Sequence, residues 1–115
     1  MGADCLFCRI ISQEIPSDIV YEDDMVLAFR DINPQAPVHI LVIPKKHIPT
    51  IADLQDADRE LMGHIHLVIK EIAEKEGIAE EGYRVVVNCR EQAAQSVFHV
   101  HFHLLGGRSF GWPPG

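Results

Sequence analysis

Three histidines stand at alternate positions near the end of the chain, His99, His101 and His103, with the apolar residues Val100 and Phe102 between them. Side chains on a strand alternate between its two faces, so this spacing places the three imidazoles together and the apolar residues opposite. Alternate strand positions lie roughly 6.5 to 7 Å apart, which lets the rings act on one phosphate-sized group or on two adjacent sites. Histidine can serve at pH 7 as nucleophile, base or metal ligand. The pattern favours a chemical cluster over histidines that merely decorate a half-exposed strand.

A second candidate site is the pair Cys5 and Cys8, whose Cys-x-x-Cys spacing lets two thiolates converge on one soft metal ion. One pair supplies half of a tetrahedral site, and His47 and His99 are candidates for the other two ligands. A Cys₂His₂ set would be a closed, structural zinc site. Two alternatives stay open here, because the cysteines could instead be small core residues or act in redox chemistry. Cys89 has no partner by spacing.

Composition limits the partners that such sites can serve. The chain has 115 residues, 47% of them hydrophobic, which favours one domain over residues 1–115. Its formal net charge of −7 argues against broad electrostatic binding to nucleic acid or to an anionic membrane. No stretch approaches the roughly 18 apolar residues of a membrane span, and three sparse cysteines suit a reducing compartment. We therefore expect a cytoplasmic protein whose anionic ligands, if any, are small and held by local donors.

Hydrophobic periodicity indicates the elements that must position these residues. Apolar residues from Leu54 to Ile72 recur at intervals of three and four, which predicts one long helix that begins near Asp56 and ends with Lys75 and Gly77. His64 and His66 fall inside it, as ordinary surface or packing residues. A short helical turn is expected at 6–12, and strands at 20–21, 25–29, 39–43, 83–88 and the histidine run. The result is an α+β domain with a mostly antiparallel sheet.

Four stretches of the chain carry a family resemblance. They are Gln-Ser-Val-Phe-His-Val-His-Phe-His-Leu-Leu-Gly-Gly-Arg at 95–108, the segment 29–39, Val-Ile-Pro-Lys-Lys-His at 42–47, and Trp-Pro-Pro-Gly at 112–115. Together they resemble the histidine triad (HIT) family of nucleotide-binding and nucleotide-hydrolysing proteins. The tail is similar to that of the Hint branch, the purine nucleoside phosphoramidases. The cysteine pair resembles a mainly microbial subset of that branch, which carries zinc.

The resemblance implies a fold, an assembly and a reaction. The fold would be HIT-like, with a five-stranded antiparallel sheet and one long and one short helix, and the protein a homodimer with one ten-stranded sheet. The reaction would be cleavage of the P–N bond of adenosine 5′-phosphoramidates, with release of AMP through a covalent nucleotidyl-histidine intermediate. His101 would be the nucleophile and His39 its support and proton relay. His103 and Ser96 would donate to phosphate or leaving-group atoms as charge develops.

The resemblance also implies the binding residues. Asp31 would accept hydrogen bonds from the ribose hydroxyls, and Phe7, Phe29 and Ile32 would line the base pocket. Without the resemblance, Phe7 and Phe29 would be assigned to the core. The implied nucleotide contacts are Phe7, Phe29, Asp31, Ile32, Asn88, Gln95, Ser96, Val97, His101 and His103. The implied metal is a structural zinc on Cys5, Cys8, His47 and His99, with no cofactor required for the chemistry.

Three alternative functions stay open on the sequence. The protein could hydrolyse dinucleoside polyphosphates, act as a non-catalytic purine nucleotide-binding interaction module, or hold one catalytic zinc on all three histidines of the run. Two departures from the pattern of many relatives also stand out, since Ala93-Ala94 replaces a glycine pair and Arg30 replaces a histidine. Each added Cβ restricts the backbone. We therefore expect an altered leaving-group site and altered contacts near the ribose.

Overall fold

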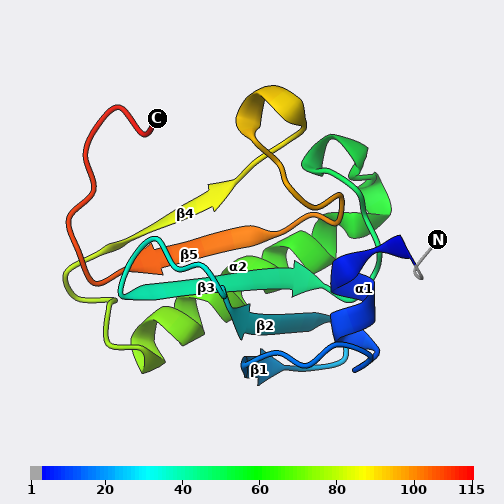
Figure 1. Cartoon of the computed structure of the whole chain (residues 1–115), viewed down its shortest axis with the longest axis horizontal. Helices are drawn as coiled ribbons and strands as arrows, with labels where there is room; N and C mark the ends of the chain where they lie inside the picture. The colour runs from blue at the N-terminus through cyan, green and yellow to red at the C-terminus, as the bar shows by residue number, and fades with distance from the viewer. Residues whose placement is uncertain (1–3) are drawn as a thin grey trace.

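The computed structural model describes residues 4–115 and contains one five-stranded antiparallel sheet with a helix on each face (Figure 1). The strand order is β1-β2-β3-β5-β4, so β1 and β4 are the two edges. This agrees with the predicted α+β class. The strands are β1 (Ile19–Glu22), β2 (Val26–Arg30), β3 (Val38–Pro44), β4 (Tyr83–Val87) and β5 (Phe102–Gly106), and the helices are α1 (Leu6–Ile11) and α2 (Arg59–Lys75).

The long helix α2 covers one face of the sheet. Its buried residues Ile65, Val68 and Ile69 lie in one apolar cluster with Val42 of β3 and Phe102 of β5. Burying side chains of this size stabilises the fold by about 1.5–3 kcal/mol each relative to leaving them exposed. Within residues 4–115, no helix combines the length and apolarity that a bilayer crossing requires.

The opposite face of the sheet carries α1 and the catalytic candidates. Phe7 and Ile10 of α1 pack on the sheet residues Phe29 and Leu41 in a second apolar cluster. The ring of His101 meets the ring of Phe7 edge-on, with 5.1 Å between the centroids. The predicted alternation is confirmed, since the histidines face α1 while the residues between them face α2.

The helix α2 begins three residues later than expected. Two 3₁₀ turns, Ile51–Asp53 and Asp56–Asp58, precede it. The second turn forms because the side chain of Asp58 accepts a hydrogen bond from the backbone N–H of Gln55, at 2.9 Å. The predicted end is confirmed, because Gly77 follows the last turn with φ of +76°, a conformation that glycine adopts without steric cost.

The expectation of one strand through all three histidines is wrong, because β5 begins at Phe102. Extending its register with β3 would place Val100 opposite Pro44, which has no N–H to donate. The carbonyl of Pro44 accepts instead from the His99 ring, and the N–H of Val100 donates to the carbonyl of Ile48 at 2.7 Å. The strand β4 likewise ends at Val87, one residue earlier than predicted.

Candidate active site and metal centre

The imidazole of His101 is buried, and its hydrogen bond defines its reactive atom. Nδ1 lies 2.8 Å from the carbonyl oxygen of His99. A carbonyl oxygen can only accept, so Nδ1 carries the hydrogen, and Nε2 of the neutral ring keeps its lone pair. Burial lowers the pKa of His101, against the raising effect of the hydrogen bond and of Asp31, so the ring is neutral at pH 7. Nε2 is therefore a candidate nucleophile.

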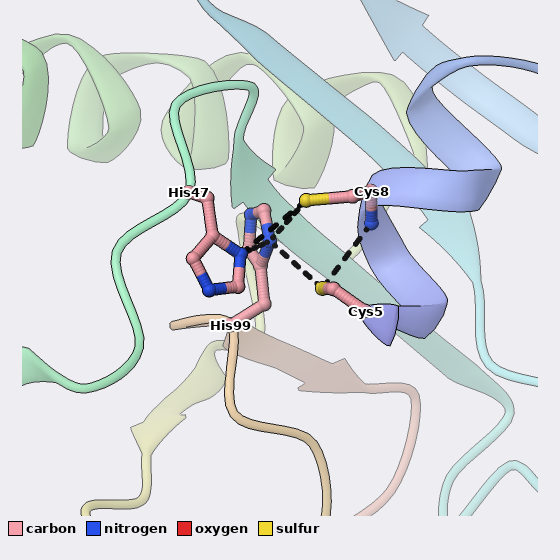
Figure 2. A group of neighbouring side chains, drawn as sticks. All are labelled: Cys5, Cys8, His47 and His99. Carbon is pink, nitrogen blue, oxygen red and sulfur yellow. Dashed lines mark hydrogen bonds between the residues drawn. The ribbon is translucent and has the colours of Figure 1, made fainter. Parts of the chain in front are cut away.

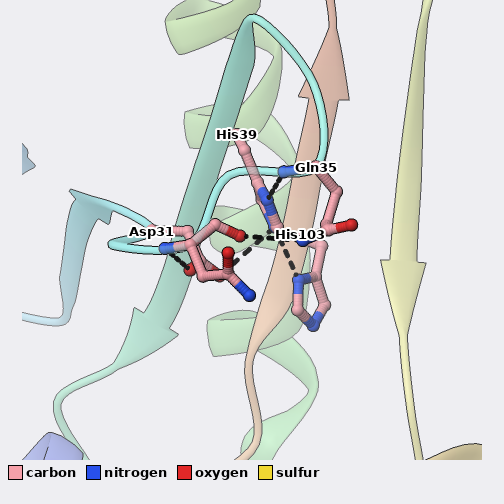
Figure 3. A network of polar contacts seen from close by, with 5 residues as sticks. Asp31, Gln35, His39 and His103 are labelled. Atoms are coloured by element: carbon pink, nitrogen blue, oxygen red, sulfur yellow. Dashed lines mark hydrogen bonds and ion pairs between the residues drawn. The ribbon is translucent and has the colours of Figure 1, made fainter.

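A second pair of imidazoles lies beside it. The backbone N–H of Gln35 donates to Nδ1 of His39 at 3.0 Å, which puts the hydrogen of neutral His39 on Nε2. That Nε2 lies 3.0 Å from Nδ1 of His103 and 3.4 Å from a carboxylate oxygen of Asp31 (Figure 3). His39 therefore donates to His103, and the hydrogen of neutral His103 is on Nε2. This atom is available to a ligand as a donor.

Burial also keeps this pair neutral. It lowers the pKa of His103 to about 4, helped by the nearby His101 and His39 and opposed by Asp31. Burial lowers the pKa of His39 as well, again against Asp31. At pH 7 the two rings thus form a directed chain from Gln35 through His39 to His103, in which each ring carries one hydrogen at a defined atom.

A cavity of about 330 Å³ lies between α1 and the sheet. Its walls include the rings of Phe7 and Phe29, whose centroids are 5.5 Å apart, and the carboxylate of Asp31 lies at its rim. Six predicted nucleotide contacts line it: Phe7, Phe29, Asp31, Ile32, Ser96 and Val97. Sequence reasoning missed Leu6, Ile10, Ile15, Pro16, Ser17 and Leu41, whose only signal was their closeness in sequence to Phe7 or to strand β3.

The other four predicted contacts do not line this cavity: Asn88, Gln95, His101 and His103. Gln95 has an architectural role, because its amide donates to the carbonyls of Pro49 and Val97 and accepts from the N–H of Arg90. Asn88 is half-buried just after β4, and Ser96 is exposed. Gln95 therefore holds the loop on which Ser96 is presented.

The predicted metal ligands come together at the N-terminal end of α1. Figure 2 shows Cys5, which precedes α1, and Cys8 of α1 facing His99 and His47, which follows β3. The ligand atoms all lie within 4.8 Å of one another. Sγ of Cys8 is 3.3 Å from Nδ1 of His47, and Sγ of Cys5 is 3.4 Å from Nδ1 of His99. The four residues can converge on one ion.

The chemistry of these donors fits zinc. Nε2 of His99 donates to the carbonyl of Pro44 at 2.8 Å, so the lone pair of the neutral ring is on Nδ1, which faces the cysteines. Such a hydrogen bond behind a ligating imidazole fixes its orientation. Burial lowers the pKa of His99 to about 4, which leaves it neutral. Two cysteine thiolates and two imidazole nitrogens are a usual set of ligands for a closed tetrahedral zinc site.

Asp31, His39 and His103 also bring possible ligand atoms within 4.8 Å of one another. The hydrogen bonds argue against metal binding there, because neutral His39 uses Nδ1 to accept from Gln35 and so presents a hydrogen, not a lone pair, from Nε2. His99 faces the cysteines, and His101 belongs to neither cluster of ligand atoms. This arrangement does not fit the alternative of one catalytic zinc on all three histidines.

The HIT domain family matches residues 12–110 of this chain. The chain belongs to the histidine triad (HIT) family. An uncharacterised HIT-like protein of Synechococcus elongatus is 55% identical over 115 residues, which are all of both chains. The purine nucleoside phosphoramidase of Escherichia coli K12 is 52% identical over 111 residues, 96% of this chain and 93% of its own. The crystal structure of a HIT family hydrolase from Legionella pneumophila has a TM-score of 0.96 at 54% identity, covering 97% of this chain and 100% of that chain.

Ala94 and Arg30, near which the family resemblance implied altered contacts, have defined places in the structure. Ala94 adopts φ of +63°, a left-handed conformation that costs a residue with a Cβ roughly 1–2 kcal/mol. Arg30 lines the cavity, but its guanidinium forms two hydrogen bonds with Glu76 after α2, at 2.9 and 3.1 Å. The arginine thus ties β2 to the end of α2.

Proposed function

We propose that this HIT protein hydrolyses the P–N bond of adenosine 5′-phosphoramidates and releases AMP through a nucleotidyl-His101 intermediate. One observation carries the proposal. The imidazole of His101 is buried and neutral, and its Nδ1–H donates to the carbonyl of His99. Its Nε2 therefore keeps a lone pair, and the ring lies beside a cavity with two aromatic walls. The identity to a purine nucleoside phosphoramidase supports the same class of substrate.

The first step would form the covalent intermediate. The base would occupy the cavity between Phe7 and Phe29, and Asp31 at its rim would accept hydrogen bonds from the ribose. Nε2 of His101 forms a bond to the α-phosphorus as the P–N bond breaks. The amine leaves with one proton that solvent supplies through the hydroxyl of Ser96, because an amine is a poor leaving group until it is protonated.

The second step would hydrolyse the intermediate and regenerate the free enzyme. Water adds to the phosphorus, the P–Nε2 bond to His101 breaks, AMP leaves, and one proton returns to solvent. In both steps Nε2–H of His103 donates to a non-bridging oxygen, where negative charge increases in the transition state. The hydrogen bond from His39 keeps His103 in the tautomer that can do this.

The metal centre would be structural in this scheme. Zinc on Cys5, Cys8, His47 and His99 would join α1 to the end of β3 and to the segment before β5. Bound metal would supply crosslinking of these segments, and no chemical step depends on it. The residues that act on the phosphate and the leaving group in both steps are His101, His103 and Ser96.

A single-turnover experiment tests the proposed reaction. Excess enzyme is mixed with AMP-amide or an AMP-lysine conjugate, quenched within milliseconds to seconds, and analysed for AMP bound covalently to protein. We expect an acid-labile adduct on His101 that forms and decays as free AMP appears. Tight AMP binding with neither adduct nor turnover would support the non-catalytic interaction module instead. Preferential cleavage of a dinucleoside tetraphosphate would support the polyphosphate hydrolase.

We also propose that the protein is a homodimer in which two sheets join at β4. This strand is an edge of the sheet, and its residues Tyr83 and Val85 are 38% and 39% exposed. Leu67 of α2 is 62% exposed. An unpaired edge with apolar side chains is a template for pairing with another strand. Sedimentation velocity tests this proposal, and a single species with the mass of one chain would contradict it.

A further inference from the structure

We propose that the metal ligands position the nucleotide site, so that metal occupancy sets the affinity for the nucleotide. The inference rests on the proposed nucleotide pocket and goes beyond a stabilising role for the metal. Two short stretches of the chain connect the metal centre to this pocket. One is residues 5–8 at the start of α1, and the other is residues 99–101. Each segment carries metal ligands and, one or two residues away, a group of the nucleotide site.

The first connection runs through α1. Cys5 is the residue before the helix, and its Sγ accepts a hydrogen bond from the N–H of Cys8 at 3.3 Å. Phe7 lies between these two ligands and forms the wall of the cavity against Phe29 and the ring of His101. The helix has only six residues, and isolated helices shorter than about 12–15 residues are marginal in water. Metal–sulfur bonds at both cysteines would fix the position of Phe7.

The second connection runs through His99. Its ring is fully buried, with Nε2 bonded to Pro44 and Nδ1 directed at the cysteines. Its backbone carbonyl accepts the Nδ1 hydrogen of His101 at 2.8 Å and so fixes the tautomer of the proposed nucleophile. A shift of the His99 ring would move this carbonyl. The metal ligand is therefore also a positioning residue for His101.

Two of the four ligands of the metal centre also line a cavity at the molecular surface. A second cavity, of about 470 Å³, reaches the ligands Cys5 and His47 from outside. Leu6, Ser96 and Val97 line both this cavity and the nucleotide cavity, so they form a shared wall.

Thermodynamic linkage gives the expected size of the effect. If metal binding orders α1 before the nucleotide arrives, nucleotide binding no longer bears that entropic cost. Coupling between two sites in proteins typically changes affinity by roughly 5–150-fold, and the change must be equal in both directions. We expect the AMP dissociation constant to fall about tenfold on metal loading, within that range. AMP should then lower the zinc dissociation constant by the same factor.

Calorimetry on the full chain measures both directions. AMP, which is not turned over, is titrated into protein loaded with zinc and into protein treated with a chelator. Zinc affinity is then measured against a competing chelator with and without saturating AMP. Hydrogen exchange of the amides at 6–11 and 98–101 supplies an independent measurement, and both segments should be better protected when zinc is bound.

Two variants separate coupling from a general loss of structure. His47→Gln removes a ligand that lies on neither connecting segment, and we expect it to bind AMP with the metal-free affinity at zinc concentrations that load the wild type. The matched control is His66→Gln on α2, an exposed residue outside the metal centre and the nucleotide cavity whose ring packs edge-on against Phe102, and it should retain the full response to zinc. Circular dichroism establishes that each variant is folded.

The outcomes of the inference and of the proposed function are distinct. Equal AMP affinity, within twofold, for folded zinc-loaded and metal-free protein would overturn the coupling and leave the phosphoramidase proposal intact. Failure of AMP to bind the zinc-loaded protein at millimolar concentration would contradict the proposed function itself. Equal tightening in both directions, with protection of the two segments, supports the coupling.

Discussion

Two clusters of imidazoles lie on the same side of the sheet, and they differ in which nitrogen of each ring is free. In the metal cluster, His99 donates from Nε2 to the carbonyl of Pro44, so Nδ1 is free to bind an ion. In the relay cluster, His39 accepts at Nδ1 from the N–H of Gln35, so Nε2 carries a hydrogen toward His103. One backbone acceptor and one backbone donor give the same side chain opposite roles.

The comparison teaches that residue type alone does not assign a histidine its chemistry. Like His99, His101 donates to a backbone carbonyl, but it does so from Nδ1, so its lone pair is on Nε2. Among residues 4–115, no hydrogen bond engages that Nε2, and His101 belongs to neither group of possible metal ligands, so the atom can serve as a nucleophile rather than a ligand. The partner of the second ring nitrogen decides between ligand, nucleophile and donor.

The largest effect should come from removing the nucleophile. We expect His101→Ala to lower AMP release from an adenosine phosphoramidate by roughly 10³-fold or more, as for other catalytic groups that act as one unit. Zinc content should be unchanged, because His101 belongs to neither cluster. Steady-state kinetics and metal analysis measure the two properties. Undiminished turnover, or loss of zinc with retention of turnover, would reverse the assignment of the two clusters.

Removing the metal should affect stability more than chemistry. With free zinc at a thousand times its dissociation constant, loading stabilises a folded protein by about 4 kcal/mol. For a domain of this size that corresponds to a melting temperature higher by roughly 15 °C or more. For folded, metal-free protein at saturating substrate, we expect turnover close to that of the zinc-loaded protein. Abolished turnover in chelated but folded protein would instead indicate a catalytic metal.

The donor behind His39 can be deleted without touching any side chain of the site. Gln35→Pro removes the N–H that fixes the tautomer of His39, and we expect kcat to fall about tenfold because a hydrogen bond to a buried group is worth about 1 kcal/mol or somewhat more. Gln35→Ala keeps the N–H and is the matched control, with kcat near the wild-type value. If both variants lost activity equally, the backbone donor would not control the relay.

The smallest effect should come from Asp23, a carboxylate outside both clusters that accepts a hydrogen bond from His64. Burial raises the pKa of Asp23, but hydrogen bonds from Tyr21, His64 and the N–H groups of Met25 and Val26 outweigh this and lower the pKa below its ordinary value. A lowered carboxylate pKa stabilises the fold above the unfolded pKa of about 3.9 and loses that effect as pH falls through the folded pKa.

Replacing this carboxylate should therefore make a difference that depends on pH. We expect Asp23→Asn to lower the melting temperature most above pH 5, with a difference from wild type that shrinks below pH 4. Thermal melts from pH 3 to pH 7 measure this difference. A difference that grows on acidification would contradict the direction assigned to the pKa of Asp23.

Much of the fold could be predicted from sequence because its hydrophobic periods are regular. The alternation around His101 and the three-four spacing of α2 specified the faces that the structure buries. The boundaries were less predictable, because they depend on partners distant in sequence. The strand β5 starts after His101 because of Pro44, some 55 residues earlier, whose carbonyl binds His99.

The site was predictable in its side chains and not in its backbone. Spacing singled out Cys5 and Cys8, and the four proposed ligands do come within reach of one ion. The N–H of Gln35 and the carbonyl of Pro44 could not be identified, since almost every residue carries such groups and sequence does not show where they point. The left-handed backbone of Ala94 was indicated only by the glycine pair that the family resemblance implies at 93–94.

Pro44 acts through two backbone groups, the N–H that it lacks and the carbonyl that it keeps. Its missing N–H keeps β5 from extending, while its carbonyl, which any residue could supply, orients the His99 ring. A variant such as Pro44→Ala would keep the carbonyl that accepts from His99. It would also supply an N–H, so that Val100 could pair with residue 44 and extend β5. The two arrangements would then compete for one carbonyl. In this protein a strand is kept short so that a backbone oxygen remains available to a side chain.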